Sequence, residues 1–157
     1  WVNDLPYLQP VDSPEDGDSI PNYYSRVAFT PEQFREKIHA SYPEADLTGD
    51  MSGWLKNAKT DSSGSVETVD VGGVTIKGTT MRTLLGLRSA CFTWEVQDGE
   101  MVFFVTGFGH GVGMSQYGAN RMAREGADYV EILTHYYTGV SVEAWSGLSG
   151  FTNEAEP

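Results

Sequence analysis

The stretch at residues 106–119 combines many glycines with side chains that could do chemistry. Glycine adopts positive φ angles readily and lets another group approach the main chain closely, so alternating glycines indicate a backbone that something approaches. The alternating glycines are Gly107, Gly109, Gly111 and Gly113. An imidazole, a hydroxyl, a carboxamide and a phenol accompany them, from His110, Ser115, Gln116 and Tyr117.

Three familiar kinds of site do not fit this stretch: a phosphate-binding loop, a serine nucleophile and a zinc site. A Walker loop would end in Gly-Lys-Ser/Thr, and a dinucleotide fingerprint beginning at Gly107 would need a glycine where Val112 stands. Ser115 could act as a nucleophile with His110 or His135, but no nucleophile-elbow motif surrounds it and the third member cannot be chosen. Zinc would need a ligand pair such as His-Glu-x-x-His, which is absent. We therefore predict no metal and no cofactor.

The same side chains suit a neutral ligand rich in hydroxyl and acetamide groups, such as a glycan. Sugar rings stack on a phenol, while a carboxamide, a hydroxyl and main-chain N–H groups pair with amides and hydroxyls. Each residue also has a structural alternative. Ser115 could be a helix N-cap and Tyr117 a core aromatic, and taken singly these two are better explained in that way. Gln116 could lie on a helix surface, and His110 could be a buried histidine bonded to main-chain carbonyls.

A function is nevertheless favoured for the cluster as a whole. Packing alone gives no reason for so many glycines directly after a strand. A second candidate set lies upstream, where Arg82 and Arg88 flank a Leu-Leu-Gly-Leu segment and Ser89 follows. These two arginines could equally be surface charges or partners of the many carboxylates, and we weigh that alternative evenly against a site role.

Short helices and hairpins must position these residues. Residues 30–33 have the form of a capping box with Pro at the first helical position, which predicts an amphipathic helix that ends before Pro43. Alternating apolar residues at 66–76 and 92–105 predict two β-hairpins, whereas residues 44–64 carry no regular pattern. The hairpin turns would be Gly72-Gly73 and Asp98-Gly99.

Three further short helices are expected. Residues 80–86 fit one or two helical turns closed by glycine, and residues 120–125 fit a helix followed by a C-terminal glycine. Another capping box opens a helix over residues 128–139. We expect an extended, loop-rich opening segment over residues 1–30, because prolines and acidic residues crowd it, and a frayed tail over residues 143–157.

Length and charge limit the possible fold and partners. The chain has 157 residues, 22 acidic and 10 basic, with a formal net charge of -12. This length supports one core, so we predict a single α+β domain of antiparallel hairpins packed with a few short helices. The negative charge makes nucleic acid and bare membrane poor partners, and we expect no nucleic-acid binding. No apolar run approaches the roughly 20 residues of a membrane span, and Cys91 has no second cysteine to pair with. No signal-peptide pattern is visible, so we expect any targeting segment to lie outside the sequence.

Residues 109–119, Gly-His-Gly-Val-Gly-Met-Ser-Gln-Tyr-Gly-Ala, resemble the C-terminal part of the stage II sporulation protein D family and its amidase-enhancer relatives. The segment from Arg82 to Phe92 and the opening Pro6-Tyr7-Leu8 also fit the pattern of that family. The resemblance thus covers nearly all of residues 1–157, as the C-terminal part of a domain of this kind.

The resemblance implies a peptidoglycan lytic transglycosylase that cleaves denuded glycan strands during engulfment in sporulation. It also implies a partner cell-wall amidase and a location on the extracytoplasmic, cell-wall side of a bacterial membrane, with the parent protein anchored N-terminally. The reaction needs a carboxylic acid that protonates the glycosidic oxygen and then accepts the proton of the muramyl 6-hydroxyl.

The family's catalytic glutamate stands in a Glu-Met/Val-Pro context that this sequence lacks. The glutamates Glu15, Glu32, Glu95 and Glu131 all occupy other contexts. We therefore expect the chain to contribute the glycan-binding wall of the site, with His110 and Gln116 supporting the acid. The alternative is a non-catalytic, glycan-binding enhancer of a cell-wall amidase. The expected substrate contacts are His110, Gly111, Gly113, Ser115, Gln116 and Tyr117, followed by Arg82, Arg88 and Ser89.

Overall fold

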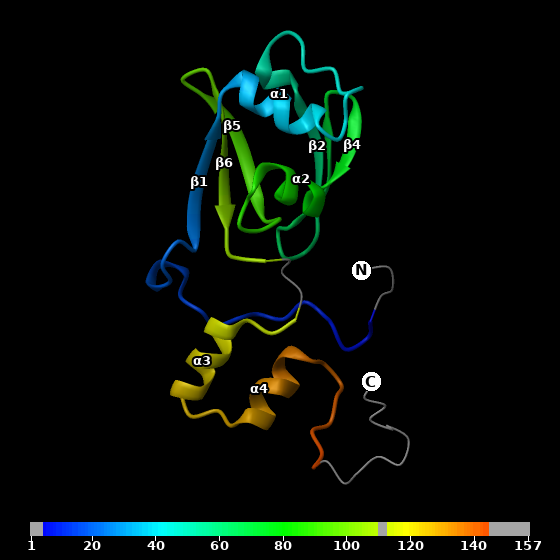
Figure 1. The fold of residues 1–157 in the computed structure, drawn as a ribbon. Coiled ribbons are helices and arrows are strands. Elements are labelled where there is room, and N and C mark those ends of the chain that lie inside the picture. Colours follow the sequence, from blue (N-terminus) through cyan, green and yellow to red (C-terminus); the bar gives the residue numbers. More distant parts are fainter. Residues whose placement is uncertain (1–4, 110–112, 145–157) are drawn as a thin grey trace, which may run out of the picture. The chain divides into compact units, whose positions relative to one another are not determined.

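The computed structural model describes residues 5–109 and 113–144. The chain divides into two compact units, which we call the sheet unit (residues 12–112) and the helical unit (residues 1–11 and 113–157). Within these described residues, both sheets lie in the sheet unit, and each unit contains two α-helices (Figure 1). The predicted α+β class is confirmed.

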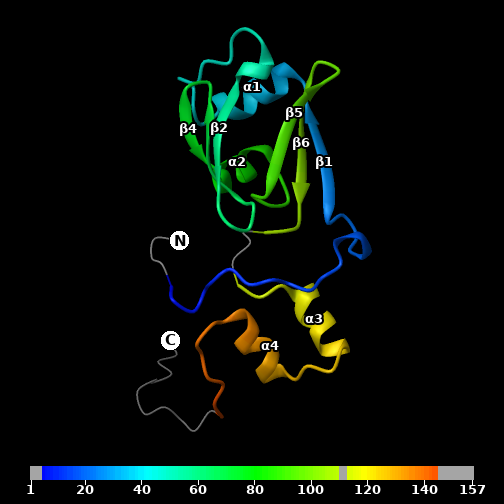
Figure 2. The same ribbon diagram turned by 180° about the vertical axis from the view of Figure 1, so that it is seen from behind.

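Two antiparallel sheets of three strands make up most of the sheet unit (Figures 1 and 2). The first has the order β1-β6-β5 and the second the order β2-β3-β4. Both predicted hairpins are confirmed, and their turn residues have the positive φ angles that a tight hairpin turn requires. The strands are β1 (Tyr24–Phe29), β2 (Leu55–Thr60), β3 (Val66–Val71), β4 (Val74–Lys77), β5 (Phe92–Gln97) and β6 (Glu100–Thr106).

Two strands lie where the sequence predicted none. β1 falls within residues 1–30, which were expected to be an irregular opening segment, and that expectation is wrong for Tyr24–Phe29. β1 forms because the buried strand β6 offers it a pairing edge along its whole length. β2 is exposed after Leu55 and pairs with β3 in an irregular register, so it carries no apolar alternation that could predict it.

Two helices complete the sheet unit. α1 (Pro31–His39) has the predicted capping box, and α2 (Gly78–Leu85) ends at Gly86 in the left-handed conformation. α1 packs against β1 and β6, α2 packs against β3 and β4, and the two helices contact each other. Phe34 of α1 stacks between Trp54 and Phe103, at centroid distances of 5.9 and 6.2 Å, in the centre of the core.

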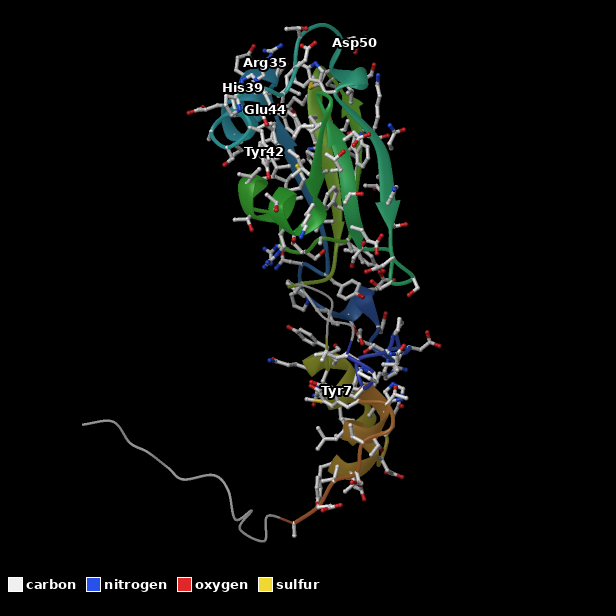
Figure 3. All side chains as sticks on the ribbon, turned by 90° about the vertical axis from the view of Figure 1, so that its right-hand side faces the viewer. Tyr7, Arg35, His39, Tyr42, Glu44 and Asp50 are labelled. Atoms are coloured by element: carbon white, nitrogen blue, oxygen red, sulfur yellow. The ribbon has the colours of Figure 1, made fainter. Side chains whose placement is uncertain are left out.

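The irregular segment after α1 is fixed by side chains of that helix. Arg35 donates from Nε to the main-chain oxygen of Leu47 at 3.0 Å, and His39 Nε2 lies 2.9 Å from the oxygen of Ala45. Both side chains point from α1 toward this segment (Figure 3). These two bonds hold residues 45–47 against α1, so a segment without a regular sequence pattern still contributes Ala45 and Leu47 to the core.

The helical unit contains α3 (Gln116–Arg124) and α4 (Tyr129–Tyr136). α3 begins four residues before the predicted start, and α4 opens on the predicted capping box. The N-terminal segment joins this unit through a hydrogen bond of 3.0 Å from the Thr138 N–H to the Tyr7 oxygen. Most of the predicted frayed tail lies outside the described residues. Within the described ranges, no helix has the length and apolar character of a membrane span.

Candidate functional site

The glycine-rich stretch leaves β6 through a fixed loop base, which we define as residues 106–109. Gly107 and Gly109 both have a φ of +72°, and their N–H groups donate to different partners. The Gly107 N–H bonds the oxygen of Tyr23 at 2.7 Å, and the Gly109 N–H bonds the oxygen of Arg88 at 2.8 Å. The loop base is thus fastened on one side to the start of β1 and on the other to the segment after α2. His110, Gly111 and Val112 lie outside the described residues.

Arg82 and Arg88, which we call the arginine pair, lie together beside this loop base. Arg82 on α2 donates from Nε to the Arg88 main-chain oxygen at 3.2 Å. That same oxygen accepts the Gly109 N–H, so the pair and the loop base share one hydrogen-bonded junction. The Arg88 guanidinium carbon lies 5.7 Å from the centre of the Phe108 ring. The structure therefore unites two segments that the sequence identified separately.

Ser89 supports the loop base from within the protein. Its side chain is buried, and its hydroxyl donates to the Thr106 oxygen at 2.6 Å and accepts the Cys91 N–H at 3.1 Å. Ser89 also forms a parallel bridge with Gly109. Because the hydroxyl is buried and bonded to both Thr106 and Cys91, Ser89 supports the loop base, which argues against its predicted role as a glycan contact.

Three aromatic residues that were not among the predicted site residues lie at or beside the loop base: Tyr23, Tyr24 and Phe108. The Tyr23 ring lies edge-on to Tyr24, with centroids 5.1 Å apart, and edge-on to Phe108 at 6.5 Å. Tyr24 and Phe108 are exposed. Burial, assisted by the nearby Glu15 charge, raises the pKa of the Tyr23 phenol, which stays neutral and uncharged at physiological pH. Phe108 could have been found from its position among the glycines, but Tyr23 and Tyr24 carry no signal in the sequence.

The remaining candidates lie in the helical unit, at the start of α3. Ser115 is the N-cap, and its Oγ accepts the Gly118 N–H at 3.1 Å, so the structural alternative at this residue is correct. Gln116 and Tyr117 occupy the first turn and are exposed, so the alternative of Tyr117 as a core aromatic is wrong. Gly113 has a φ of +90°, a conformation that favours glycine. His135 packs edge-on against Tyr136, as expected of a scaffold residue.

A hollow of about 580 Å³ lies elsewhere on the sheet unit. Gln33, Glu36 and Lys37 of α1 line it together with Thr83 of α2, and none of the predicted site residues does. In residues 5–109 and 113–144, no three His, Cys, Asp or Glu side chains gather as a metal site would require. The loop base and its arginine pair therefore remain the chemically distinctive feature of this unit.

Relatives of the chain are found among known proteins, although no protein-family model matches it. It is 40% identical over 152 residues, 96% of its length, to Stage II sporulation protein D of Bacillus amyloliquefaciens. It is 38% identical over 142 residues, 90% of its length, to the protein of the same name of Bacillus subtilis (strain 168). The Amidase enhancer of Bacillus subtilis (strain 168) is 31% identical over 87 residues, 54% of this chain and 12% of that protein.

The matched segments make up 42% and 39% of the two sporulation proteins, so the chain spans about two fifths of their length. The matches extend over nearly the whole chain, including both units. They confirm the resemblance that residues 109–119 indicate.

Proposed function

Because the chain is homologous to about two fifths of Stage II sporulation protein D, we propose that it forms the glycan-binding wall of a peptidoglycan-cleaving site used in sporulation. The substrate is the glycan strand of peptidoglycan after its stem peptides have been removed. The protein works on the extracytoplasmic, cell-wall side of the membrane, beside an amidase that removes those peptides.

The observation that carries this proposal is the homology over 96% of the chain. The described geometry supports it in two ways. In the sheet unit, hydrogen bonds fasten the base of the glycine-rich loop, so the loop starts from a fixed position. In the helical unit, Gln116 and Tyr117 are exposed on the first turn of α3, and a carboxamide and a phenol are groups that commonly contact sugars.

The chemistry proposed for the complete site is that of a lytic transglycosylase. A carboxylic acid gives its proton to the glycosidic oxygen as the C–O bond breaks. The resulting carboxylate takes the proton of the muramyl 6-hydroxyl, whose oxygen closes a 1,6-anhydro ring on the same sugar. We place the acid in the part of the relatives that this chain does not span, and we assign this chain the tasks of holding and orienting the strand.

The test is to incubate the purified chain with denuded peptidoglycan and to search for anhydromuramyl products by mass spectrometry. We expect no product from this chain alone. A protein extended by the upstream segment of its relatives should release product. Release by the short chain would overturn the assignment of the acid to the upstream part, and failure of both proteins would overturn the proposed reaction.

A second candidate function is favoured by the match to the Amidase enhancer. In this alternative, the chain binds glycan and stimulates a cell-wall amidase without cutting the strand itself. Measuring the rate at which a purified amidase releases stem peptides, with and without the chain, separates the two candidates. Stimulation by a chain whose extended form yields no anhydromuramyl product would favour the enhancer.

A further inference from the structure

The charge of the arginine pair is unusual for this chain. The protein has a net charge of -12, so carboxylates greatly outnumber its basic groups. The ion pairs in the described ranges join Arg35 to Glu32 and Arg121 to Glu125. Among residues 5–109 and 113–144, neither Arg82 nor Arg88 has a carboxylate within 4 Å. Two arginines joined by a hydrogen bond from the Arg82 side chain to the Arg88 main chain thus have no acidic partner among the described residues, in a strongly acidic protein.

The positions of these charges are fixed by the fold. Arg82 is partly buried on α2, and its Nε bonds the Arg88 main-chain oxygen, which leaves the other N–H groups of its guanidinium for a further partner. Arg88 is exposed, and its guanidinium lies over the Phe108 ring. A guanidinium over an aromatic face keeps its charge and its planar fork of donors. Each arginine thus has one contact that positions its side chain beside the loop base and keeps further N–H donors that an anion could accept.

The pair is also joined to the loop that the proposed function assigns to the glycan. The Arg88 oxygen accepts N–H groups from both Arg82 and Gly109, and the neighbouring Ser89 bonds the end of β6. A ligand group bound by the two guanidiniums would therefore lie beside the loop base. Because the loop base is assigned to the glycan, an anionic group of the glycan strand is the anion expected beside the two arginines.

We propose that Arg82 and Arg88 bind a carboxylate of the glycan strand and so select strands that have lost their stem peptides. This inference rests on the proposed function. A muramyl residue carries its stem peptide on the carboxyl of its lactyl ether, as a neutral amide. Once the peptide is removed, that position becomes a free carboxylate. A guanidinium donates two parallel hydrogen bonds to a carboxylate but has no ionic partner in an amide.

The test compares one strand in two chemical forms. Soluble denuded muramyl strands with free carboxylates are prepared, and part of the sample is converted to neutral methylamides. Binding of the full 157-residue chain to each form is measured by titration calorimetry. We expect tighter binding of the carboxylate form, and Arg88→Gln should weaken that binding about five- to tenfold, as for an exposed charge-assisted contact. The same variant should leave binding of the methylamide form unchanged.

Three controls make the result specific. Arg26→Gln removes the same charge from an exposed site on β1 of the same unit and should have no effect on either form. Arg88→Lys keeps the charge but loses the planar fork, so it should give an intermediate affinity. Thermal unfolding of each variant checks that the fold is intact, and Arg88 is preferred to Arg82 because its structural bonds are made by its main chain.

The outcomes separate this inference from the proposed function. Equal affinity for the two forms, or equal losses for both in Arg88→Gln, would overturn the inference and leave glycan binding in place. An Arg26→Gln effect as large as that of Arg88→Gln would also overturn it, because net charge would then explain the result. Failure of the chain to bind either form would overturn both proposals.

Discussion

At the scale of single residues, the buried hydroxyl of Ser89 helps to fix the position at which the glycine-rich loop leaves β6. Ser89 is buried and bonds both the last residue of β6 and the Cys91 N–H, so it joins the segment after α2 to the loop base. Nothing in a serine between an arginine and an alanine suggests this task. Ser89 therefore helps to fix the segment that contains Arg88, the residue before it.

Replacing Ser89 with Ala should lower the free energy of unfolding by about 1–3 kcal/mol, because two partly buried main-chain groups, the Thr106 oxygen and the Cys91 N–H, lose their hydrogen bonds to the buried hydroxyl. Denaturant titration followed by tryptophan fluorescence measures this loss. Ser62→Ala is the matched control, since Ser62 is exposed, and it should leave stability unchanged. Equal stabilities of the two variants would contradict the bonding role of Ser89.

Tyr117 belongs to the same scale, because its exposed phenol is a direct candidate for stacking on a sugar ring. Tyr117→Ala should weaken binding of denuded strands by about twofold to twelvefold, the range expected for an aromatic contact of about 0.5–1.5 kcal/mol. Pull-down with insoluble denuded peptidoglycan measures the change. Tyr129→Ala removes another exposed phenol, from α4 of the same unit, and should bind normally. Unchanged binding in Tyr117→Ala would remove this residue from the site.

At the scale of elements, α2 carries Arg82 and must approach β3 closely. Gly78 makes this possible, because a Cβ built on it would lie 1.9 Å from the Val66 oxygen. Glycine at position 78 leaves room for α2 to pack on β3, and no pattern in the sequence indicates this contact. The position of Arg82 on α2 therefore depends on the absence of a side chain at Gly78.

Gly78→Ala should cost about 3 kcal/mol or more, because the added methyl overlaps a main-chain atom that cannot move without its strand. The midpoint of thermal unfolding, or the loss of soluble protein, measures the effect. Gly53→Ala is the control, since the nearest atoms to its added Cβ are 3.8 Å away, at the end of a lysine. A normal midpoint in Gly78→Ala would show that α2 can move away from β3.

One carboxylate adds side-chain hydrogen bonds across all three strands of the second sheet. Asp70 on β3 accepts a bond of 2.6 Å from the Thr75 hydroxyl and one of 2.9 Å from the Asn57 amide. The bond from Thr75 has the largest effect on the pKa of the Asp70 carboxyl, and together with the bond from Asn57 it holds that pKa below its usual range. Since the charged form is the bonded one, its contribution to stability is present above the usual carboxyl pKa and is lost as the pH falls through the lowered value.

Asp70→Asn should consequently reduce the loss of stability that acid causes below about pH 4. Unfolding midpoints of both proteins between about pH 6 and pH 2 measure the difference. Glu67→Gln, an exposed carboxylate on the same strand, serves as the control and should retain the full dependence of the parent. A parallel decline of Asp70→Asn and the parent protein would contradict the role given to Asp70.

At the scale of the whole molecule, the candidate residues are divided between two units. The arginine pair and the loop base belong to the sheet unit, while Gly113, Gln116 and Tyr117 belong to the helical unit. The net charge of -12 also belongs to this scale, because it disfavours any polyanion that lacks a specific contact.

The chain should therefore not be retained by double-stranded DNA or heparin at about 0.15 M salt, where exposed charges still act over about 8 Å. Elution from a heparin column and a DNA mobility shift check this. Retention on both would contradict the exclusion of polyanions drawn from composition. Denuded strands should still bind under the same conditions, because their carboxylates are expected to meet the arginine pair.

The sequence by itself determined the features that depend on neighbours a few residues apart. Both capping boxes, both hairpin turns and the glycine after α2 are where the residue types predict them, because a cap or a turn needs partners within about four positions. The homology was also visible in the sequence, because residues 109–119 carry it in one continuous segment.

Only the tertiary structure decided which distant segments meet. β1 became a strand because β6, more than 70 residues later, offered it an edge, and β2 did so on the edge of β3 without any apolar alternation. Arg88, Gly109 and Tyr23 met at the loop base for the same reason. Such pairings depend on which surfaces are buried together, and burial is a property of the complete core that a local pattern of residues does not contain.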